Sequence, residues 1–211
     1  MRPTTIFFDV GNTLLFPNRQ RILLPLAERG LIPSNEQWRT IERKTKREYD
    51  EAVASGCSDH GFCRNFYGHL LADFGIEDEL VKTALTANTR QSANWDEIRP
   101  GTKEALGRIG EQYRLGVISN ADGKIDRVLE SCGIAGCFQT ITDSGLIGKE
   151  KPDPVIFEAA LAAMGSRPEE GLYVGDVYTV NYLGATGADV PTVTRARDAL
   201  RTAGKMPALR L

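Results

Sequence analysis

Strand-like and helix-like segments alternate along the second half of the chain, from about residue 114 to residue 194. Short apolar runs such as "RLGVISN" and "GLYVGD" are predicted to be strands. The segment "DPVIFEAALAAMG" is predicted to be a helix, with Asp153 at its N-cap, Pro154 at its first position and Gly165 past its end. Strands that alternate with helices predict a parallel sheet whose crossover helices pack on both faces. "TIFFDV", close to residue 1, is apolar without alternation and is expected to be a further strand of this sheet, buried on both faces.

A helical segment interrupts this pattern after its first strand. Ser34 with Gln37 three residues later resembles a capping box, and apolar residues follow at helical spacing. Two more apolar stripes are expected on helices of this segment: Phe62, Phe66, Leu70 and Phe74, and then Leu80, Ala84 and Leu85. We therefore expect an α/β protein with a Rossmann-like parallel-sheet core, formed by residues 1–15 and 96–211, and an inserted helical cap domain at residues 16–95.

The charge and hydropathy of the chain argue against several classes of partner. The formal net charge of −2 gives no electrostatic reason to expect binding to nucleic acid or to an anionic membrane. No apolar stretch is long enough to span a membrane, and "MRPTTIFF" lacks the apolar region of a signal peptide. We therefore expect a cytoplasmic protein that acts on a small molecule, and the sequence leaves its oligomeric state open between monomer and homodimer.

Polar side chains follow the predicted strands at their carboxyl ends. Asp9 follows the first strand, Ser119 and Asn120 follow "LGVI", and Asp176 follows "LYV". Ligands of open α/β sheets bind outside the carboxyl ends of the strands, so we expect these residues to share one edge of the sheet. Lys151, in "GKEKPDP" before the next helix, is expected to join them.

Two carboxylates at one sheet edge repel each other unless a cation lies between them. Hard oxygen ligands in small number favour Mg²⁺, which keeps several waters and shares substrate phosphates. A lysine, a hydroxyl and free N–H groups at turns would hold such a phosphate. The residue types at this edge therefore predict a magnesium site that also binds phosphate.

Four ordered pieces of the chain resemble the haloacid dehalogenase (HAD) superfamily, in particular its phosphatase-like members with a helical cap after the first motif. The pieces are "FFDVGNTLL", "GVISNADG", "GKEKPDPVIFEAAL" and "YVGDVYTVNYLGATGAD". Each piece is short, but their order, their strand context and the length of the insertion make the resemblance specific, and it covers nearly the whole chain. The resemblance implies a Mg²⁺-dependent phosphatase that acts on a small phosphorylated metabolite.

The resemblance also implies a role for each polar residue at the sheet edge. Asp9 would be the nucleophile, attacking phosphorus to form an aspartyl-phosphate, and Lys151 would neutralise both the nucleophile and the transferring group. The residues implied to hold phosphate oxygens are Thr13, Ser119, Asn120 (through its backbone N–H) and Lys151. The residues implied to hold Mg²⁺ are Asp9, Asp176 and Gly11 (through its backbone carbonyl).

The chain departs from the family's pattern close to these residues. Active phosphatases of the family usually have a second aspartate where this chain has Gly11; that side chain protonates the leaving oxygen and later activates water, which typically contributes about 10²–10⁴-fold. Asn181 stands where a supporting aspartate is common, so one negative charge near the cation is missing. Asn12 replaces the usual glycine, but asparagine tolerates a positive φ, so the turn remains possible.

These departures leave three hypotheses open. The first is a phosphatase whose activity is low or limited to good leaving groups. The second is a hydrolase that cleaves another bond, like the family's dehalogenases or its phosphonoacetaldehyde hydrolases; the latter use a cap lysine as a Schiff base, and Lys44 and Lys46 are the candidates, although "RKTKRE" is expected to be a solvated helix face. The third is a non-catalytic phosphate-binding homologue, which Gly11 and Asn181 favour and the retained Asp9 and Lys151 oppose.

Overall fold

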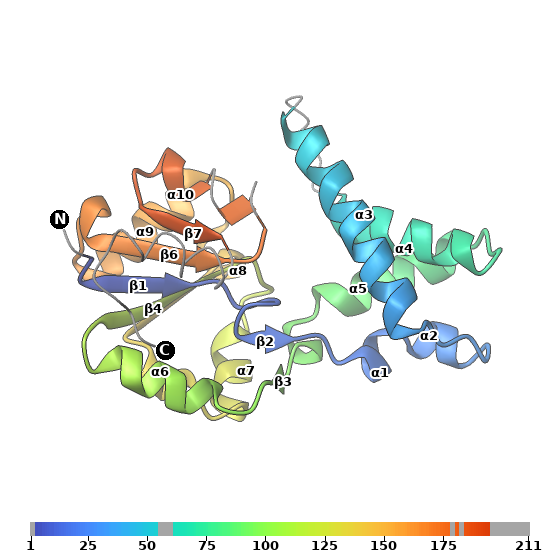
Figure 1. Cartoon of the computed structure of the whole chain (residues 1–211), viewed down its shortest axis with the longest axis horizontal. Helices are drawn as coiled ribbons and strands as arrows, with labels where there is room; N and C mark the ends of the chain where they lie inside the picture. The colour runs from blue at the N-terminus through green and yellow to red at the C-terminus, as the bar shows by residue number, and fades with distance from the viewer. Residues whose placement is uncertain (1–2, 55–60, 178–179, 182–183, 195–211) are drawn as a thin grey trace. The chain divides into compact units, whose positions relative to one another are not determined.

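The computed structural model of the chain describes residues 3–54, 61–177, 180–181 and 184–194, and these residues form two compact units (Figure 1). The first unit contains Met1–Phe16 and Trp95–Leu211, and the second contains Pro17–Asn94. The chain therefore passes between the units twice, directly after Phe16 and directly after Asn94. Phe16 and Trp95, which the sequence pattern places in the helical segment, group with the sheet unit.

The first unit is built on a parallel sheet of five strands in the order β5–β4–β1–β6–β7. The strands are β1 (Thr5–Phe8), β4 (Arg114–Ser119), β5 (Thr140–Asp143), β6 (Gly171–Gly175) and β7 (Thr192–Thr194). Phe8 is in register with Val117 of β4 and Val174 of β6, so Asp9 leaves β1 at the edge where the neighbouring strands also end. The predicted parallel α/β sheet is confirmed.

Helices cover both faces of this sheet (Figure 1). Helices α6 (Thr102–Gly110) and α7 (Ile125–Ser131) pack on one face, and α9 (Pro154–Met164) and α10 (Gly184–Gly187) pack on the other. The buried cluster on the first face includes Ile6, Phe8, Val10, Leu106, Leu115, Val117, Val128 and Leu129. The cluster on the second face includes Phe7, Ile118, Ile156, Phe157, Tyr173 and Ala185. Successive side chains of β1 alternate between the two clusters, which explains why its apolar run is continuous.

The helices of the sheet unit begin in two different ways. In α9 the predicted signals are confirmed: the side chain of Asp153 accepts a hydrogen bond from the backbone N–H of Val155 at 3.0 Å, and Gly165 has a φ of 61°. Asp122, which precedes the helix after β4, is not the N-cap of that helix. Its N-cap is Lys124, and the buried carboxylate of Asp143 accepts from the N–H of Gly123 at 3.0 Å and from the N–H of Ile125 at 3.2 Å. Because Asp143 comes from another strand, local spacing could not reveal this cap.

Two short strands complete the sheet unit at the places where the chain leaves and re-enters it. Strand β2 (Leu15–Phe16) pairs antiparallel with β3 (Glu97–Ile98), with Leu15 opposite Ile98. The short helix α8 (Ser144–Ile147) follows β5, and its first turn is also capped by Asp143, which accepts from the N–H of Gly145 at 2.8 Å.

The second unit is helical in the part that the structure describes. Its helices are α1 (Arg19–Ile22), α2 (Leu24–Ala27), α3 (Asn35–Ala54), α4 (Phe62–Asp73) and α5 (Glu79–Arg90). The capping box at α3 is confirmed, because Gln37 N–H donates to Ser34 Oγ at 3.1 Å and Ser34 N–H donates to Gln37 Oε1 at 2.9 Å.

One apolar stripe of this unit differs from the prediction. Leu80 is 84% exposed, whereas Val81 and Leu85 are buried. Val81 and Leu85 are four residues apart and share one face of α5, and Leu80 lies about 100° around the helix from Val81.

No helix in the described ranges of the chain is both long enough and apolar enough to cross a bilayer.

Candidate functional site

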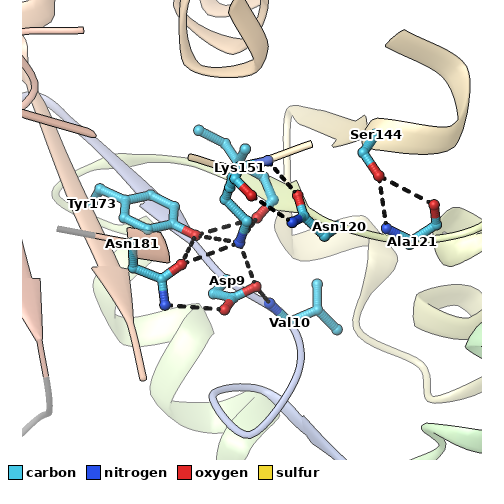
Figure 2. Close-up of polar contacts among 9 residues, drawn as sticks. Asp9, Val10, Asn120, Ala121, Ser144, Lys151, Tyr173 and Asn181 are labelled. Carbon is cyan, nitrogen blue, oxygen red and sulfur yellow. Dashed lines mark hydrogen bonds and ion pairs between the residues drawn. The ribbon is translucent and has the colours of Figure 1, made fainter. Parts of the chain in front are cut away.

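Asp9 lies at the centre of the polar cluster in the sheet unit, immediately after β1 (Figure 2). The residue is 9% exposed. Its Oδ1 accepts two short hydrogen bonds, from the N–H of Val10 at 2.8 Å and from Nζ of Lys151 at 2.8 Å. Its Oδ2 accepts one longer bond, from Nδ2 of Asn181 at 3.3 Å. One carboxylate oxygen is therefore held firmly, and the other keeps more capacity for a further partner.

Lys151 reaches Asp9 from the segment before α9 and is itself 2% exposed. Its Nζ lies 2.7 Å from the hydroxyl of Tyr173, 2.8 Å from Asp9 Oδ1, 3.1 Å from the carbonyl oxygen of Ile118 and 3.3 Å from Oδ1 of Asn181. An ammonium has three N–H bonds, so these acceptors use all of them. A buried ammonium needs such partners, because leaving it unpaired costs several kcal/mol. Lys151 is thus built into the cluster.

The side chain of Asn120 holds the backbone of Lys151 (Figure 2). Its Oδ1 accepts from the N–H of Lys151 at 2.7 Å, and its Nδ2 donates to the carbonyl of the same residue at 3.0 Å. These two bonds join the end of β4 to the segment that carries the lysine. The sequence predicted a backbone role for Asn120, which stays a prediction, whereas this side-chain contact was not foreseen.

Tyr173 is the residue of the cluster that sequence reasoning missed. It comes from β6 and is fully buried, and its hydroxyl accepts from Lys151 and donates to Oδ1 of Asn181 at 3.1 Å. Burial raises the pKa of Tyr173 well above its usual value, and the carboxylates of Asp9 and Asp176 raise it further, so the residue is a neutral hydroxyl. The available signal was chemical: a tyrosine in a strand buried on both faces must find a partner for its hydroxyl.

The glycine before Asp176 makes room for Asn181. A Cβ atom on Gly175 would lie 2.4 Å from Nδ2 and 2.5 Å from Cγ of Asn181, far inside normal contact distance. Asn181 is fully buried and can therefore reach both Asp9 and Lys151 only because residue 175 has no side chain.

The donor groups around Asp9 fit Mg²⁺ in kind. Asp176 is half-buried after β6. The charges of Asp176 and Asp9 both raise the pKa of Tyr173, so both carboxylates act on the same hydroxyl. Among the described residues, no group of three or more His, Cys, Asp or Glu side chains is placed to hold a metal. Two carboxylates and a main-chain carbonyl would leave the remaining positions to water and substrate, which is the usual way that Mg²⁺ is bound.

One of the two hydroxyls predicted to hold phosphate has no protein partner. Thr13 Oγ1 is buried without any hydrogen bond, and Ser119 is a buried residue at the end of β4. An unpaired buried hydroxyl costs about 1–3 kcal/mol and calls for a missing ligand or water. The structure does not join these two hydroxyls to Asp9 by direct hydrogen bonds.

The turn after Asp9 contains Gly11 and Asn12. Asn12 has a φ of 55°, which confirms that it takes the left-handed conformation expected at this position, and its N–H donates to the carbonyl of Leu15 at 2.8 Å. Gly11 is not in the left-handed region. A Cβ atom there would lie 3.4 Å from Cζ3 of Trp95, an ordinary van der Waals distance. The backbone therefore does not require glycine at residue 11.

Lys44 and Lys46, the Schiff-base candidates, lie on α3 of the second unit. Nζ of Lys44 is 3.2 Å from Nδ1 of His69 and 3.9 Å from a carboxylate oxygen of Glu48, and Nζ of Lys46 is 3.2 Å from Glu42. The hydrogen bond from His69 lowers the pKa of Glu48. These i,i+4 ion pairs are typical of a helix surface.

Comparisons with known proteins found similar sequences and a similar fold. The family model of the haloacid dehalogenase-like hydrolases matches residues 3–189. Glyceraldehyde 3-phosphate phosphatase of Methanothermobacter thermautotrophicus is 30% identical over 198 residues, covering 89% of this chain and 83% of that protein. Haloacid dehalogenase-like hydrolase domain-containing protein 3 of Xenopus laevis is 28% identical, covering 85% and 79%. The magnesium-bound structure of YfnB from Bacillus subtilis has a TM-score of 0.71 at 20% identity, covering 94% of this chain and 89% of that one, which supports the fold.

Proposed function

The chain belongs to the haloacid dehalogenase-like hydrolases, and from this premise we propose that it is a Mg²⁺-dependent phosphatase that acts through an aspartyl-phosphate on Asp9. The observation that carries the proposal is the contact between Asp9 and Lys151, a buried carboxylate and a buried ammonium 2.8 Å apart at the carboxyl edge of the sheet. The relative named as a phosphatase supports a small phosphorylated metabolite as the substrate.

Asp9 acts as the nucleophile in this proposal. A carboxylate oxygen attacks phosphorus, the bond between phosphorus and the leaving oxygen breaks, and the leaving group departs with the electron pair. Water then attacks the same phosphorus, which frees Asp9 and releases phosphate and a proton. Oδ2 is the better candidate for the attacking atom, because Oδ1 is already held by Val10 and Lys151. Dividing hydrolysis into two steps lowers the barrier of each.

Thr13, Ser119 and the backbone N–H of Asn120 hold the phosphate oxygens. The support for this assignment is the buried hydroxyl of Thr13, which has no partner in the protein and would gain one from phosphate. Lys151 offsets charge at Asp9, and it would contact a phosphate oxygen only by exchanging one of its present acceptors.

Asp9, Asp176 and the backbone carbonyl of Gly11 would hold Mg²⁺, which when bound neutralises charge on the phosphate oxygens. Asn181 supports this site through hydrogen bonds to Asp9 and Lys151 rather than through charge. We therefore expect weaker Mg²⁺ binding than a carboxylate at residue 181 would give.

The absence of a side chain at Gly11 limits which substrates are turned over. Without a proton donor there, the leaving group must depart as a weakly basic anion. We expect measurable hydrolysis of 4-nitrophenyl phosphate and poor hydrolysis of sugar phosphates. Equal rates on aryl and alkyl phosphates would contradict this part of the proposal.

The second unit, Pro17–Asn94, is the cap domain in this proposal and contributes to the choice of substrate. The cytoplasmic location and the state of monomer or homodimer remain predictions.

The test compares wild type with Asp9→Asn on a panel of phosphates, with Mg²⁺ and with EDTA. The substitution keeps the size of the side chain and removes the nucleophile, so we expect turnover to fall to background. Asp78→Asn is the matched control, because it makes the same change at a half-buried N-cap of the second unit, where asparagine caps equally well. Identical rates for wild type and Asp9→Asn would leave the non-catalytic phosphate-binding homologue as the better account. Adding 2-haloacids to the panel tests for cleavage of a carbon–halogen bond. Adding phosphonoacetaldehyde tests for cleavage of a carbon–phosphorus bond.

A further inference from the structure

The indole of Trp95 covers Gly11, two residues beyond the proposed nucleophile. Trp95 is half-buried and is the first residue of the sheet unit after the helical unit ends. Atoms Cζ3, Cε3 and Cη2 of its six-membered ring lie 3.4, 3.7 and 3.8 Å from the position that a Cβ atom on Gly11 would occupy. The ring is therefore within van der Waals contact of the place where a side chain at residue 11 would begin.

The direction of the preceding side chains relates the contact at Gly11 to Asp9. Along the chain from β1, Phe8 and Val10 pack in the cluster on one face of the sheet, and Asp9 between them points the other way, to Lys151. Phe8, Asp9 and Val10 alternate, and continuing this alternation by one residue would place a side chain at residue 11 on the side of Asp9. On this basis the indole would lie on the side of Gly11 that faces the proposed nucleophile.

We infer that Trp95 determines the leaving group that this site prefers, and that the substrate is a phosphate monoester of a flat aromatic alcohol, an aryl phosphate. The inference rests on the proposed function and adds the chemical class of its substrate. Two features around residue 11 favour an aryl phosphate. Gly11 supplies no proton, which favours a weakly basic phenolate as the leaving group, and the indole supplies a π-face on which an aromatic ring stacks. An acyl phosphate without a ring would satisfy the first feature only.

Binding of phosphonates tests the inference without turnover. In a phosphonate a carbon–phosphorus bond replaces the ester bond that a phosphatase cleaves. Calorimetry with phenylphosphonate and methylphosphonate, in the presence of Mg²⁺, compares wild type with Trp95→Phe, Trp95→Leu and Trp95→Ala. Wild type is expected to bind phenylphosphonate about 3- to 10-fold more tightly than methylphosphonate, the effect of one aromatic pair. Trp95→Phe keeps most of this ratio. Trp95→Leu and Trp95→Ala reduce it to about one and leave methylphosphonate binding unchanged.

Fluorescence gives a second measurement, since the chain has two tryptophans, Trp38 and Trp95. Trp38 belongs to the second unit, so Trp38→Phe leaves Trp95 as the sole reporter, and phenylphosphonate should shift its emission. The same ligand should cause no shift in Trp95→Phe, where Trp38 remains. Melting curves of every variant show whether the fold is intact, and Trp95→Phe carries the test if Trp95→Ala is unfolded.

The outcomes separate this inference from the proposed function. A phenyl-to-methyl ratio that Trp95→Leu does not change overturns the inference, even if wild type hydrolyses phosphates and Asp9→Asn does not. Failure of the proposed function is shown by equal hydrolysis in wild type and Asp9→Asn, whatever the phosphonate ratio. A ratio of about one in wild type, with methylphosphonate bound, also overturns the inference and leaves the phosphatase proposal intact.

Discussion

The hydroxyl of Tyr173 lies 2.7 Å from Nζ of Lys151, and neither side chain is open to solvent. The tyrosine gives the lysine an uncharged acceptor, and Asp9 gives it a charged one on another side. Asn181 accepts from both Lys151 and Tyr173, so these residues form one closed set of hydrogen bonds. The orientation of the ammonium is thus fixed by partners from three different parts of the chain, which is what a preorganised site requires.

Replacing Tyr173 by phenylalanine is expected to lower both stability and activity. The substitution removes one acceptor from a buried ammonium, which should cost about 1–3 kcal/mol in the free energy of unfolding. Lys151 keeps Asp9 and Ile118 as acceptors but loses part of its orientation, so kcat should fall by about 10- to 100-fold with a smaller change in KM. Denaturant unfolding and steady-state kinetics measure the two effects.

Tyr67→Phe is the matched control for this prediction. Tyr67 is also a buried tyrosine, its hydroxyl contacts Thr89, and it belongs to the second unit. The control should lose stability and keep kcat. If Tyr173→Phe behaves in the same way, the tyrosine has a structural role only.

The stability of the protein should decrease above about pH 10 because of Tyr173. Its pKa in the folded protein is raised well above the value of about 10 that it has when unfolded. Its neutral form therefore stabilises the fold fully below pH 10. Above that pH the unfolded chain loses the proton and the folded chain keeps it, so the free energy of unfolding falls by about 1.4 kcal/mol per pH unit. Burial also raises the pKa of Tyr67, which both proteins keep, so unfolding measured at pH 9, 10 and 11 should show a slope steeper by this amount in wild type than in Tyr173→Phe.

Absorbance of phenolate provides the independent check. Folded wild type and folded Tyr173→Phe should release the same number of tyrosine protons up to about pH 11, whereas the denatured forms should differ by one. A difference of one between the folded proteins would show that Tyr173 ionises normally.

The parallel sheet could be predicted because its information is local. The punctuation of α9 by Asp153 and Gly165 is complete within the segment itself, and the continuous apolar run of β1 shows that both of its faces are buried. The order of strands and helices then places the residues that follow the strands, among them Asp9, at one edge.

The contacts that were missed all depend on tertiary approach. Asp143 caps the helix after β4 from a neighbouring strand, and Tyr173 reaches Lys151 from β6. Trp95 lies against Gly11 although the whole helical unit, Pro17–Asn94, lies between them in the sequence. No spacing rule connects such pairs, so sequence patterns identify the residues that end strands and not the buried partners that orient them.

Asn181→Asp is expected to strengthen Mg²⁺ binding while it weakens the metal-free protein. The new carboxylate oxygen would face Oδ2 of Asp9, which now accepts a hydrogen bond from Nδ2 at 3.3 Å. Two carboxylates at this distance repel, so the melting temperature in EDTA should fall below that of wild type. A divalent cation removes the repulsion, so the rise in melting temperature on adding Mg²⁺ should be larger than in wild type. A smaller Mg²⁺-induced rise would contradict the assignment of the metal to Asp9.

Gly11→Asp tests whether a proton donor can be restored, and the structure indicates that the single change is insufficient. The backbone at residue 11 accepts a side chain, because its φ is not in the left-handed region and the new Cβ would lie 3.4 Å from Trp95. The carboxyl group beyond that Cβ must share space with the indole. We therefore expect Gly11→Asp alone to raise hydrolysis of alkyl phosphates only slightly. With Trp95→Ala added, the increase should approach about 10²-fold, the lower end of what a positioned acid contributes.

Rates on glycerol phosphate for wild type, both single variants and the double variant form a complete cycle, in which the effects of the two substitutions should be strongly non-additive. Additive effects would show that the indole does not occupy the space of the missing acid, and a full increase from Gly11→Asp alone would show that it moves aside without cost.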